Sequence, residues 1–195
     1  GENRSTPFDA ARHLMRLNQT VDGDASMALI TLAVLAEAAR VVDRMNLDGR
    51  VRLVDEVFAH QPNLLASVLV LQRFGVSLPH MDVPIHILLV SFRAMKDCGQ
   101  HWPVISEATQ EACLHRLTSR IRFAEGLSPE LLQQAVQQSI DQHSEPHLLA
   151  FAYGQLRDHD LLACRTDAEK HLQLATFNLV DCIGWASAQI QRASS

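Results

Sequence analysis

The stretch Pro62-Asn63-Leu64-Leu65-Ala66 occurs again 84 residues later as Pro146-His147-Leu148-Leu149-Ala150. The same offset pairs further identical residues: Arg73 with Arg157, Leu78 with Leu162, Leu88 with Leu172, and Asp97-Cys98 with Asp181-Cys182. In total, 9 of the 37 ungapped positions from Pro62 to Cys98 are identical, whereas unrelated helical sequence would give roughly three. We interpret this as a duplicated helical unit. The alternative is coincidence in a chain rich in Leu, Ala and Gln.

Hydrophobic periodicity around this stretch predicts an all-α fold, because no segment alternates with a period of two over a convincing length. We expect about nine helices: a short N-terminal helix within residues 1–25, then two similar four-helix units at 26–99 and 100–195 that pack as one globular body. Helix start and stop signals place the eight later helices. Their predicted ranges are Ser26–Asn46, Asp48–His60, Pro62–Phe74, Asp82–Cys98, Pro103–Glu125, Ser128–Gln142, Ser144–Asp158 and Thr166–Arg192.

The helix predicted at Ser26–Asn46 is the most hydrophobic of these. Apolar residues from Met27 to Leu35 cover nearly all of its faces, so we expect its first half to be buried all round. On this interpretation, Leu32→Asp would cost on the order of 3–5 kcal/mol of stability.

Composition and charge restrict the class of protein. The chain has 195 residues, 47% hydrophobic content and a net charge of -5, which indicates a soluble globular protein and argues against general nucleic-acid binding. Its most apolar run is far shorter than the ~20 residues of a membrane span. The four cysteines contain no Cys-x-x-Cys pair, so we expect free thiols, a reducing compartment and a cytoplasmic location.

Ten histidines raise the question of a metal site. Glu56 and His60 share one helical face, and so do Glu111 and His115, so these four residues are the candidate metal ligands. Carboxylate-bridged metal bundles need Glu-x-x-His on two helices, and that spacing is absent here. We therefore expect no metal and no cofactor, with the histidines solvated or structural.

Sequence motifs for catalysis are also missing. There is no Gly-x-Ser-x-Gly motif and no Gly-rich phosphate loop. Cys98 and Cys182 occupy matching positions of the repeat, which predicts equivalent packing for both rather than a catalytic thiol. We identify no catalytic residue.

A glutamine-rich helix face is the more unusual feature. Gln133, Gln134, Gln137, Gln138 and Gln142 cover much of the helix that follows Pro129. Uncharged amides are cheaper to desolvate than charges, so this face fits an interface, with Gln134 and Gln138 as its best candidates. The alternative is an ordinary polar surface.

Together these patterns favour a non-enzymatic helical interaction module that binds a protein partner or forms a homo-oligomer, such as a homodimer, and binds neither nucleic acid nor membrane. The alternative is a helical bundle that binds a small molecule or metal, as an enzyme or as the effector domain of a regulator.

Overall fold

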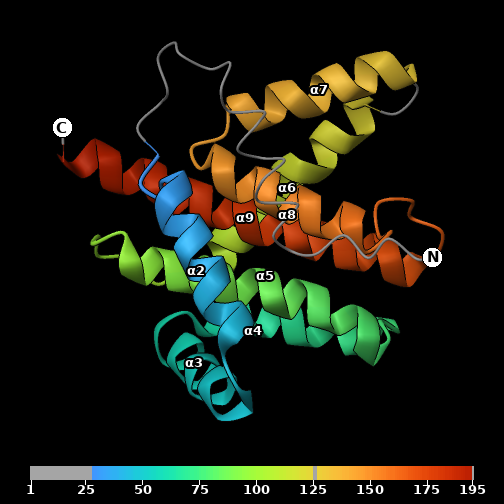
Figure 1. Ribbon diagram of the computed structural model, residues 1–195. Coiled ribbons are helices and arrows are strands. Elements are labelled where there is room, and N and C mark those ends of the chain that lie inside the picture. The colour runs from blue at the N-terminus through green and yellow to red at the C-terminus, as the bar shows by residue number, and fades with distance from the viewer. Residues whose placement is uncertain (1–27, 125–126, 195) are drawn as a thin grey trace.

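The structure is a computed structural model that describes residues 28–124 and 127–194. These residues form eight α-helices, one 3-10 helix and no strand, which confirms the predicted all-α class (Figure 1). The helix expected near the N-terminus lies outside the described residues. The elements are α2 (Leu32–Arg44), α3 (Leu47–His60), α4 (Pro62–Leu69), η2 (Val70–Phe74), α5 (Leu78–Asp97), α6 (Glu107–Ala124), α7 (Pro129–Asp141), α8 (Pro146–Asp158) and α9 (Asp167–Ser194).

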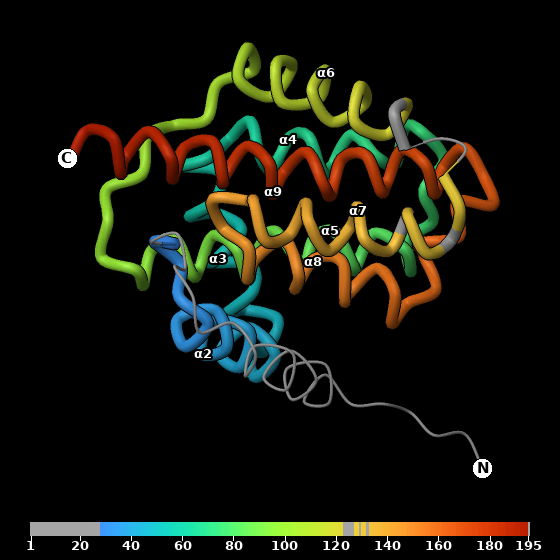
Figure 2. The backbone as a smooth tube through the Cα atoms, turned by 90° about the horizontal axis from the view of Figure 1, so that it is seen from above, coloured from blue at the N-terminus to red at the C-terminus, as the bar shows by residue number. Residues whose placement is uncertain are grey.

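Two long helices, α5 and α9, form the centre of the fold. They pack on each other, and most of the other helices cover them: α2 and α3 contact α5, α6 contacts α9, and α4 and α8 contact both. Helix α7 packs instead on α8. Figure 2 shows α6 lying along α9. One continuous core results, in which Ile87 and Leu88 of α5 and Leu179 and Ile183 of α9 are fully buried.

The start of α2 differs from the prediction. Residues 28–31 are not helical, and α2 begins at Leu32 with Thr31 as its N-cap. The reason is a long-range contact, because the backbone N–H groups of Leu29 and Ile30 donate to the buried carboxylate of Glu145. Leu32 is partly exposed at the helix edge, so the expectation that this half is buried all round is wrong. The buried residues of α2 form one face: Leu35, Ala38 and Val42.

Helix α5 begins earlier than predicted. It starts at Leu78, after Ser77, and therefore includes residues that we expected to lie in a loop capped by Asp82. Pro84 lies inside the helix, although proline is normally disfavoured at interior helix positions because it lacks a backbone N–H. Burial of Met81 in the core accounts for the extra turn.

Helix α6 begins later than predicted, at Glu107 and not at Pro103. The side chain of Gln61, at the start of α4, holds the preceding segment in a non-helical path. Its amide donates to the carbonyl of Pro103 at 2.8 Å and accepts from the N–H of Ile105 at 3.0 Å. Ser106 then caps the helix by accepting from Thr109 N at 3.1 Å.

The other helix boundaries agree closely with the sequence signals. Gly75 ends η2 with a left-handed φ of 83°, and prolines open α4, α7 and α8. At α9 the Thr166 hydroxyl accepts from Glu169 N, and the Glu169 carboxylate accepts from Arg165 N at 2.7 Å. This is the predicted capping box with its return bond moved back by one residue.

The repeated residues agree in some places and differ in others. Leu64 and Leu148 are both buried. Cys98 caps the end of α5 and is half-buried, whereas Cys182 lies inside α9 and is fully buried. The prediction that these two cysteines pack equivalently is therefore wrong.

Among the described residues, no helix combines the length and the apolar character that a membrane crossing requires.

Candidate functional site

The most unusual surface of the molecule lies on α3. Asn46 caps this helix by accepting from Gly49 N at 2.9 Å, and Leu53 and Val57 anchor it in the core. A second apolar row runs along its outer side. We call this row, Leu47, Val51, Val54 and Phe58, the α3 stripe. Leu47 is 76% exposed, Val51 51% and Phe58 67%, while Val54 is half-buried.

A shallow groove of about 290 Å³ separates the α3 stripe from α5. Val51 and Val54 line it from α3, and Ile85 and Leu89 line it from α5. Exposed apolar residues scattered singly are normal, so the feature that distinguishes the α3 stripe is a continuous row of such residues beside a groove.

Charged residues border the stripe. Arg50 and Asp55 also line the groove, and within the part of the chain that the structure describes neither forms an ion pair. His86 lies at the α5 wall, with its Nε2 3.6 Å from Asp43 Oδ1. Burial lowers the His86 pKa, and the Asp43 carboxylate opposes that shift in part. At neutral pH the groove therefore carries the guanidinium of Arg50, the two carboxylates of Asp55 and Asp82, and a neutral imidazole.

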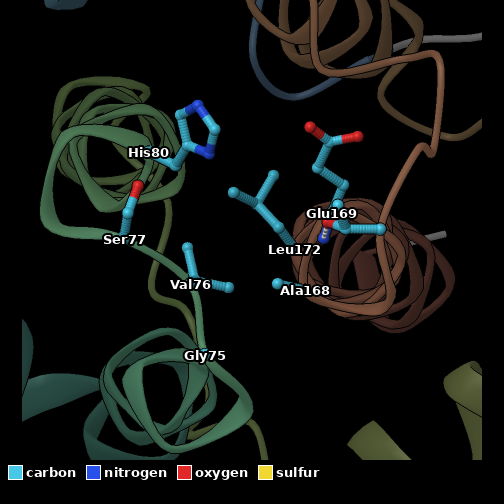
Figure 3. Close-up of a pocket in the computed structure, with 8 residues that line it drawn as sticks. Gly75, Val76, Ser77, His80, Ala168, Glu169 and Leu172 are labelled. Atoms are coloured by element: carbon cyan, nitrogen blue, oxygen red, sulfur yellow. Dashed lines mark hydrogen bonds between the residues drawn. The ribbon is translucent and has the colours of Figure 1, made fainter.

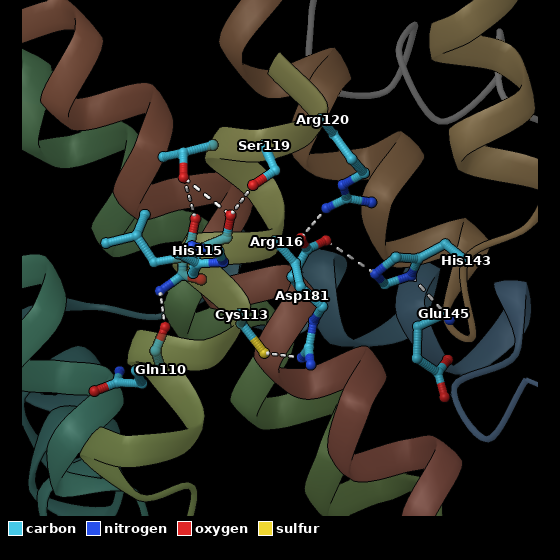
Figure 4. Close-up of polar contacts among 12 residues, drawn as sticks. Gln110, Cys113, His115, Arg116, Ser119, Arg120, His143, Glu145 and Asp181 are labelled. Carbon is cyan, nitrogen blue, oxygen red and sulfur yellow. Dashed lines mark hydrogen bonds and ion pairs between the residues drawn. The ribbon is translucent and has the colours of Figure 1, made fainter. Parts of the chain in front are cut away.

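A second polar group of residues joins α6, α9 and the turn between α7 and α8 (Figure 4). His143 Nε2 lies 3.4 Å from Asp181 Oδ1, and Arg120 forms an ion pair with the same carboxylate. His143 Nδ1 accepts from the N–H of Glu145 at 3.0 Å, so the ring proton is on Nε2 and faces Asp181. A histidine–aspartate pair can act in acid–base catalysis, but both nitrogens of this ring are already engaged. This arrangement fixes structure.

The Glu145 carboxylate beside it is fully buried. It accepts from Leu29 N at 3.0 Å, from Ile30 N at 3.1 Å and from the Ser187 hydroxyl. Desolvation raises the Glu145 pKa, and the three hydrogen bonds partly offset that shift. Glu145 therefore ties the segment before α2 to α8 and α9.

A small hollow of about 360 Å³ lies between the start of α5 and the start of α9. Figure 3 shows His80 and Glu169 on its two sides, with Leu172 between them. The Glu169 carboxylate already accepts from Arg165 N, and the Thr166 hydroxyl accepts from Glu169 N. His80 and Ser77 are the other polar residues that line the hollow. The hollow thus lacks the several convergent polar groups that a small-molecule site needs.

The candidate metal ligands from the sequence do not come together. Glu56 forms an ion pair with Lys96, and His60 stacks on Phe92. Glu111 and His115 are exposed on α6. No group of three His, Cys, Asp or Glu side chains within residues 28–124 and 127–194 could hold a metal ion.

The glutamine face is exposed, as a surface site requires. Gln134 and Gln138 lie one helical turn apart on α7, and Leu131 beside them is half exposed.

Sequence analysis missed the α3 stripe, although its spacing of four, three and four residues was visible.

Comparison of the chain with protein-family models, with curated proteins and with solved structures finds no match.

Proposed function

We propose that this protein is a non-enzymatic interaction module that self-associates through α3, with two copies of the helix packed side by side and parallel. The observation that carries the proposal is the exposed α3 stripe. Leu47, Val51 and Phe58 each expose half or more of their surface, and a second copy would remove that apolar surface from water.

The spacing of the stripe is that of a two-stranded coiled coil. Residues recurring at intervals of four, three and four occupy the alternating d and a positions of a heptad: Leu47 at d, Val51 at a, Val54 at d and Phe58 at a. In parallel coiled coils, a β-branched residue at a and Leu at d favour two strands over three or four. Val51 and Leu47 meet that pattern, whereas Val54 at d and Phe58 at a depart from it.

Charge supports the parallel orientation. Arg50 occupies the g position and Asp55 the following e position, and these positions face each other across a parallel pair. A twofold axis that runs parallel to α3, between the two copies, would therefore place Arg50 of each copy opposite Asp55 of the other and give two ion pairs. In an antiparallel pair, the e positions of one copy would face the e positions of the other. Asp48 and Asp55 both occupy e positions, so the carboxylates of the two copies would repel each other.

The size of the stripe predicts a weak dimer. Four apolar side chains and two charged ones per copy would bury roughly 1,000 Å² in total, at the lower end for specific interfaces. We therefore expect a dissociation constant on the order of micromolar to hundreds of micromolar, so that the dimer dissociates into monomers on dilution.

The test is sedimentation velocity over a concentration series from micromolar to near millimolar. Wild-type protein should shift from monomer to dimer, and the Val51→Asp/Phe58→Asp variant should remain monomeric because its charges would be desolvated on association. Leu78→Asp is the matched control, since it places a carboxylate on an exposed apolar position of α5 that belongs to neither candidate interface. A monomeric wild type, or equal dimerisation of the α3 variant, would overturn the proposal.

The glutamine face of α7 is a second candidate interface for the same function. Gln134 and Gln138 are exposed on one stripe, and amides can pair with their own copies across a twofold axis. The variant Gln134→Glu/Gln138→Glu belongs in the same series, because Glu preserves helix propensity but adds like charges. Loss of dimer in this variant alone would move the interface to α7 and reject α3.

We also propose that the two halves derive from one four-helix unit. Its support is the order of contacts: α2 packs on α5 and α3 on α4, as α6 packs on α9 and α7 on α8. The different settings of Cys98 and Cys182 weigh against it. Related sequences that retain identities at the same 84-residue offset would support duplication. Related sequences that lack those identities would reject it.

A further inference from the structure

Helix α6 is attached to the core along a narrow seam. Between Glu107 and Arg122 the only buried residues are Cys113 and Leu117. Cys113 packs against α9, where its thiol interacts with the fully buried thiol of Cys182. The seam therefore brings together two thiols from helices that are distant in sequence.

A guanidinium group lies against one of these thiols. Arg116 Nη2 donates to Cys113 Sγ at 3.0 Å, as Figure 4 shows. The Asp181 carboxylate is already engaged by Arg120 and His143, and Arg116 forms no ion pair with any residue that the structure describes, so its charge remains available to Cys113. This geometry favours a thiolate at Cys113.

The two thiols differ in their readiness to ionise. The hydrogen bond with Cys182 and the charge of Arg116 lower the pKa of Cys113 to about 6, against burial and the charge of Asp181. The pKa of Cys182 is raised, first by its interaction with Cys113 and then by burial. Cys113 is therefore the nucleophile of the pair, while Cys182 keeps its proton at neutral pH.

The other two cysteines lack these features. Cys98 donates to the carbonyl of Met95 at 3.2 Å and accepts from Trp102 Nε1. Burial, followed by the charge of Glu169, raises the pKa of Cys164. Both are more exposed than Cys113, so they serve as internal controls for simple accessibility.

We propose that Cys113 and Cys182 form a redox couple in which hydrogen peroxide or a similar small peroxide oxidises Cys113 and a disulfide then joins α6 to α9. The Cys113 thiolate attacks one peroxide oxygen, the O–O bond breaks, and the released hydroxide takes a proton to leave as water. Cys182 sulfur then attacks the sulfenic sulfur of Cys113. The S–O bond breaks, the Cys182 proton joins the departing hydroxide, and a second water leaves. Two thiols are oxidised by two electrons and one peroxide is reduced.

Access to the couple comes from the narrowness of the seam. Besides its two buried side chains, α6 is held by hydrogen bonds of Gln110 with Asn63 and Asn178 and by the Arg120–Asp181 ion pair. A helix at the surface nevertheless opens locally at lower cost than one in the centre of the core, and a peroxide is scarcely larger than water. Once formed, the disulfide would prevent that opening, because it covalently ties α6 to the central helix α9. The site is independent of the α3 stripe.

The decisive experiment is peroxide oxidation of the wild-type protein, quenched over time by thiol alkylation and read by peptide mass spectrometry. We expect Cys113 to be consumed at least about threefold faster at pH 7 than Cys98 or Cys164, since thiolate fraction outweighs the lower nucleophilicity of an acidic thiol. The product should be a Cys113–Cys182 cross-linked peptide lacking two hydrogens. The Cys113 rate should be half its maximum near pH 6 and level off above about pH 7, while the Cys164 rate continues to rise because burial raises the pKa of that thiol.

Two variants separate the role of Arg116 from general charge. Arg116→Gln should slow Cys113 oxidation several-fold, whereas Arg120→Gln, which removes the guanidinium paired with Asp181, should change it less. In Cys182→Ser, Cys113 should accumulate as a sulfenic acid that dimedone traps. Oxidation of Cys113 no faster than that of Cys98 and Cys164 in wild type would overturn the proposal, and so would cross-links that omit Cys182.

Discussion

Gly154 of α8 and Gly184 of α9 allow a matched test of the packing around His143. A Cβ added at Gly184 would lie 2.4 Å from His143 Cε1 and 2.8 Å from Nε2. The ring would have to retreat by about 1 Å to restore ordinary van der Waals contact, which weakens its contacts with Asp181 and with the N–H of Glu145. A Cβ at Gly154 meets nothing within 4 Å.

The expected magnitudes follow from these contacts. In Gly184→Ala, overpacking costs ~1–3 kcal/mol and a weakened hydrogen bond ~1 kcal/mol, against a gain of ~1 kcal/mol in helix propensity. The net loss is about 2 kcal/mol, or roughly 4–8 °C in Tm for a protein of this size. Gly154→Ala should instead raise Tm by about 2 °C, because it gains propensity without a clash.

Thermal unfolding followed by circular dichroism measures both shifts. Adding His143→Ala to Gly184→Ala should make the glycine substitution nearly neutral or stabilising, since the clashing ring is gone. Equal Tm shifts in the two single variants would refute this account of the His143 contact.

Three further predictions concern stability. Leu35→Asp should cost on the order of 3–5 kcal/mol because Leu35 is buried, whereas Leu32→Asp should cost clearly less at the partly exposed edge of α2; chemical denaturation measures both. Glu145→Gln should lose ~1–3 kcal/mol at neutral pH, because its new amide group would face backbone donors. The folded-state pKa of Glu145 is raised above the unfolded value of 4.5, so protonation of Glu145 stabilises the folded state as pH falls through the folded pKa. The loss of unfolding free energy in Glu145→Gln, measured by urea titration, should therefore be larger at pH 5 than at pH 8. Thr166→Ala should cost ~1 kcal/mol through loss of the α9 cap, and an unchanged Tm would show that Glu169 alone sustains that helix end.

Local signals in the sequence predicted much of the fold. Proline at the first turn placed the starts of α4, α7 and α8, and Gly75 placed the end of η2, because these residues act through their own backbone geometry. The errors occur where a distant side chain determines the backbone. Glu145 removes residues 28–31 from α2, and Gln61 keeps the segment before α6 out of that helix.

The candidate site was harder to predict for a different reason. Helix α3 carries two apolar rows, one with Leu53 and Val57 and one with Val51 and Phe58. Either row could enter the core, and only tertiary packing decides which one remains outside. Similarly, the proximity of Cys113 to Cys182 depends on how α6 lies on α9, which the helix pattern alone does not specify.

The most direct test of parallel self-association through α3 is a charge-swap cycle measured by sedimentation equilibrium. Arg50→Asp and Asp55→Arg should each weaken the dimer about tenfold, because each puts like charges opposite one another at two places. The double variant Arg50→Asp/Asp55→Arg recreates both ion pairs with reversed polarity, so its dissociation constant should return to within about threefold of the wild-type value. A double variant as weak as the single variants, or a wild type that stays monomeric throughout the series, would contradict the account.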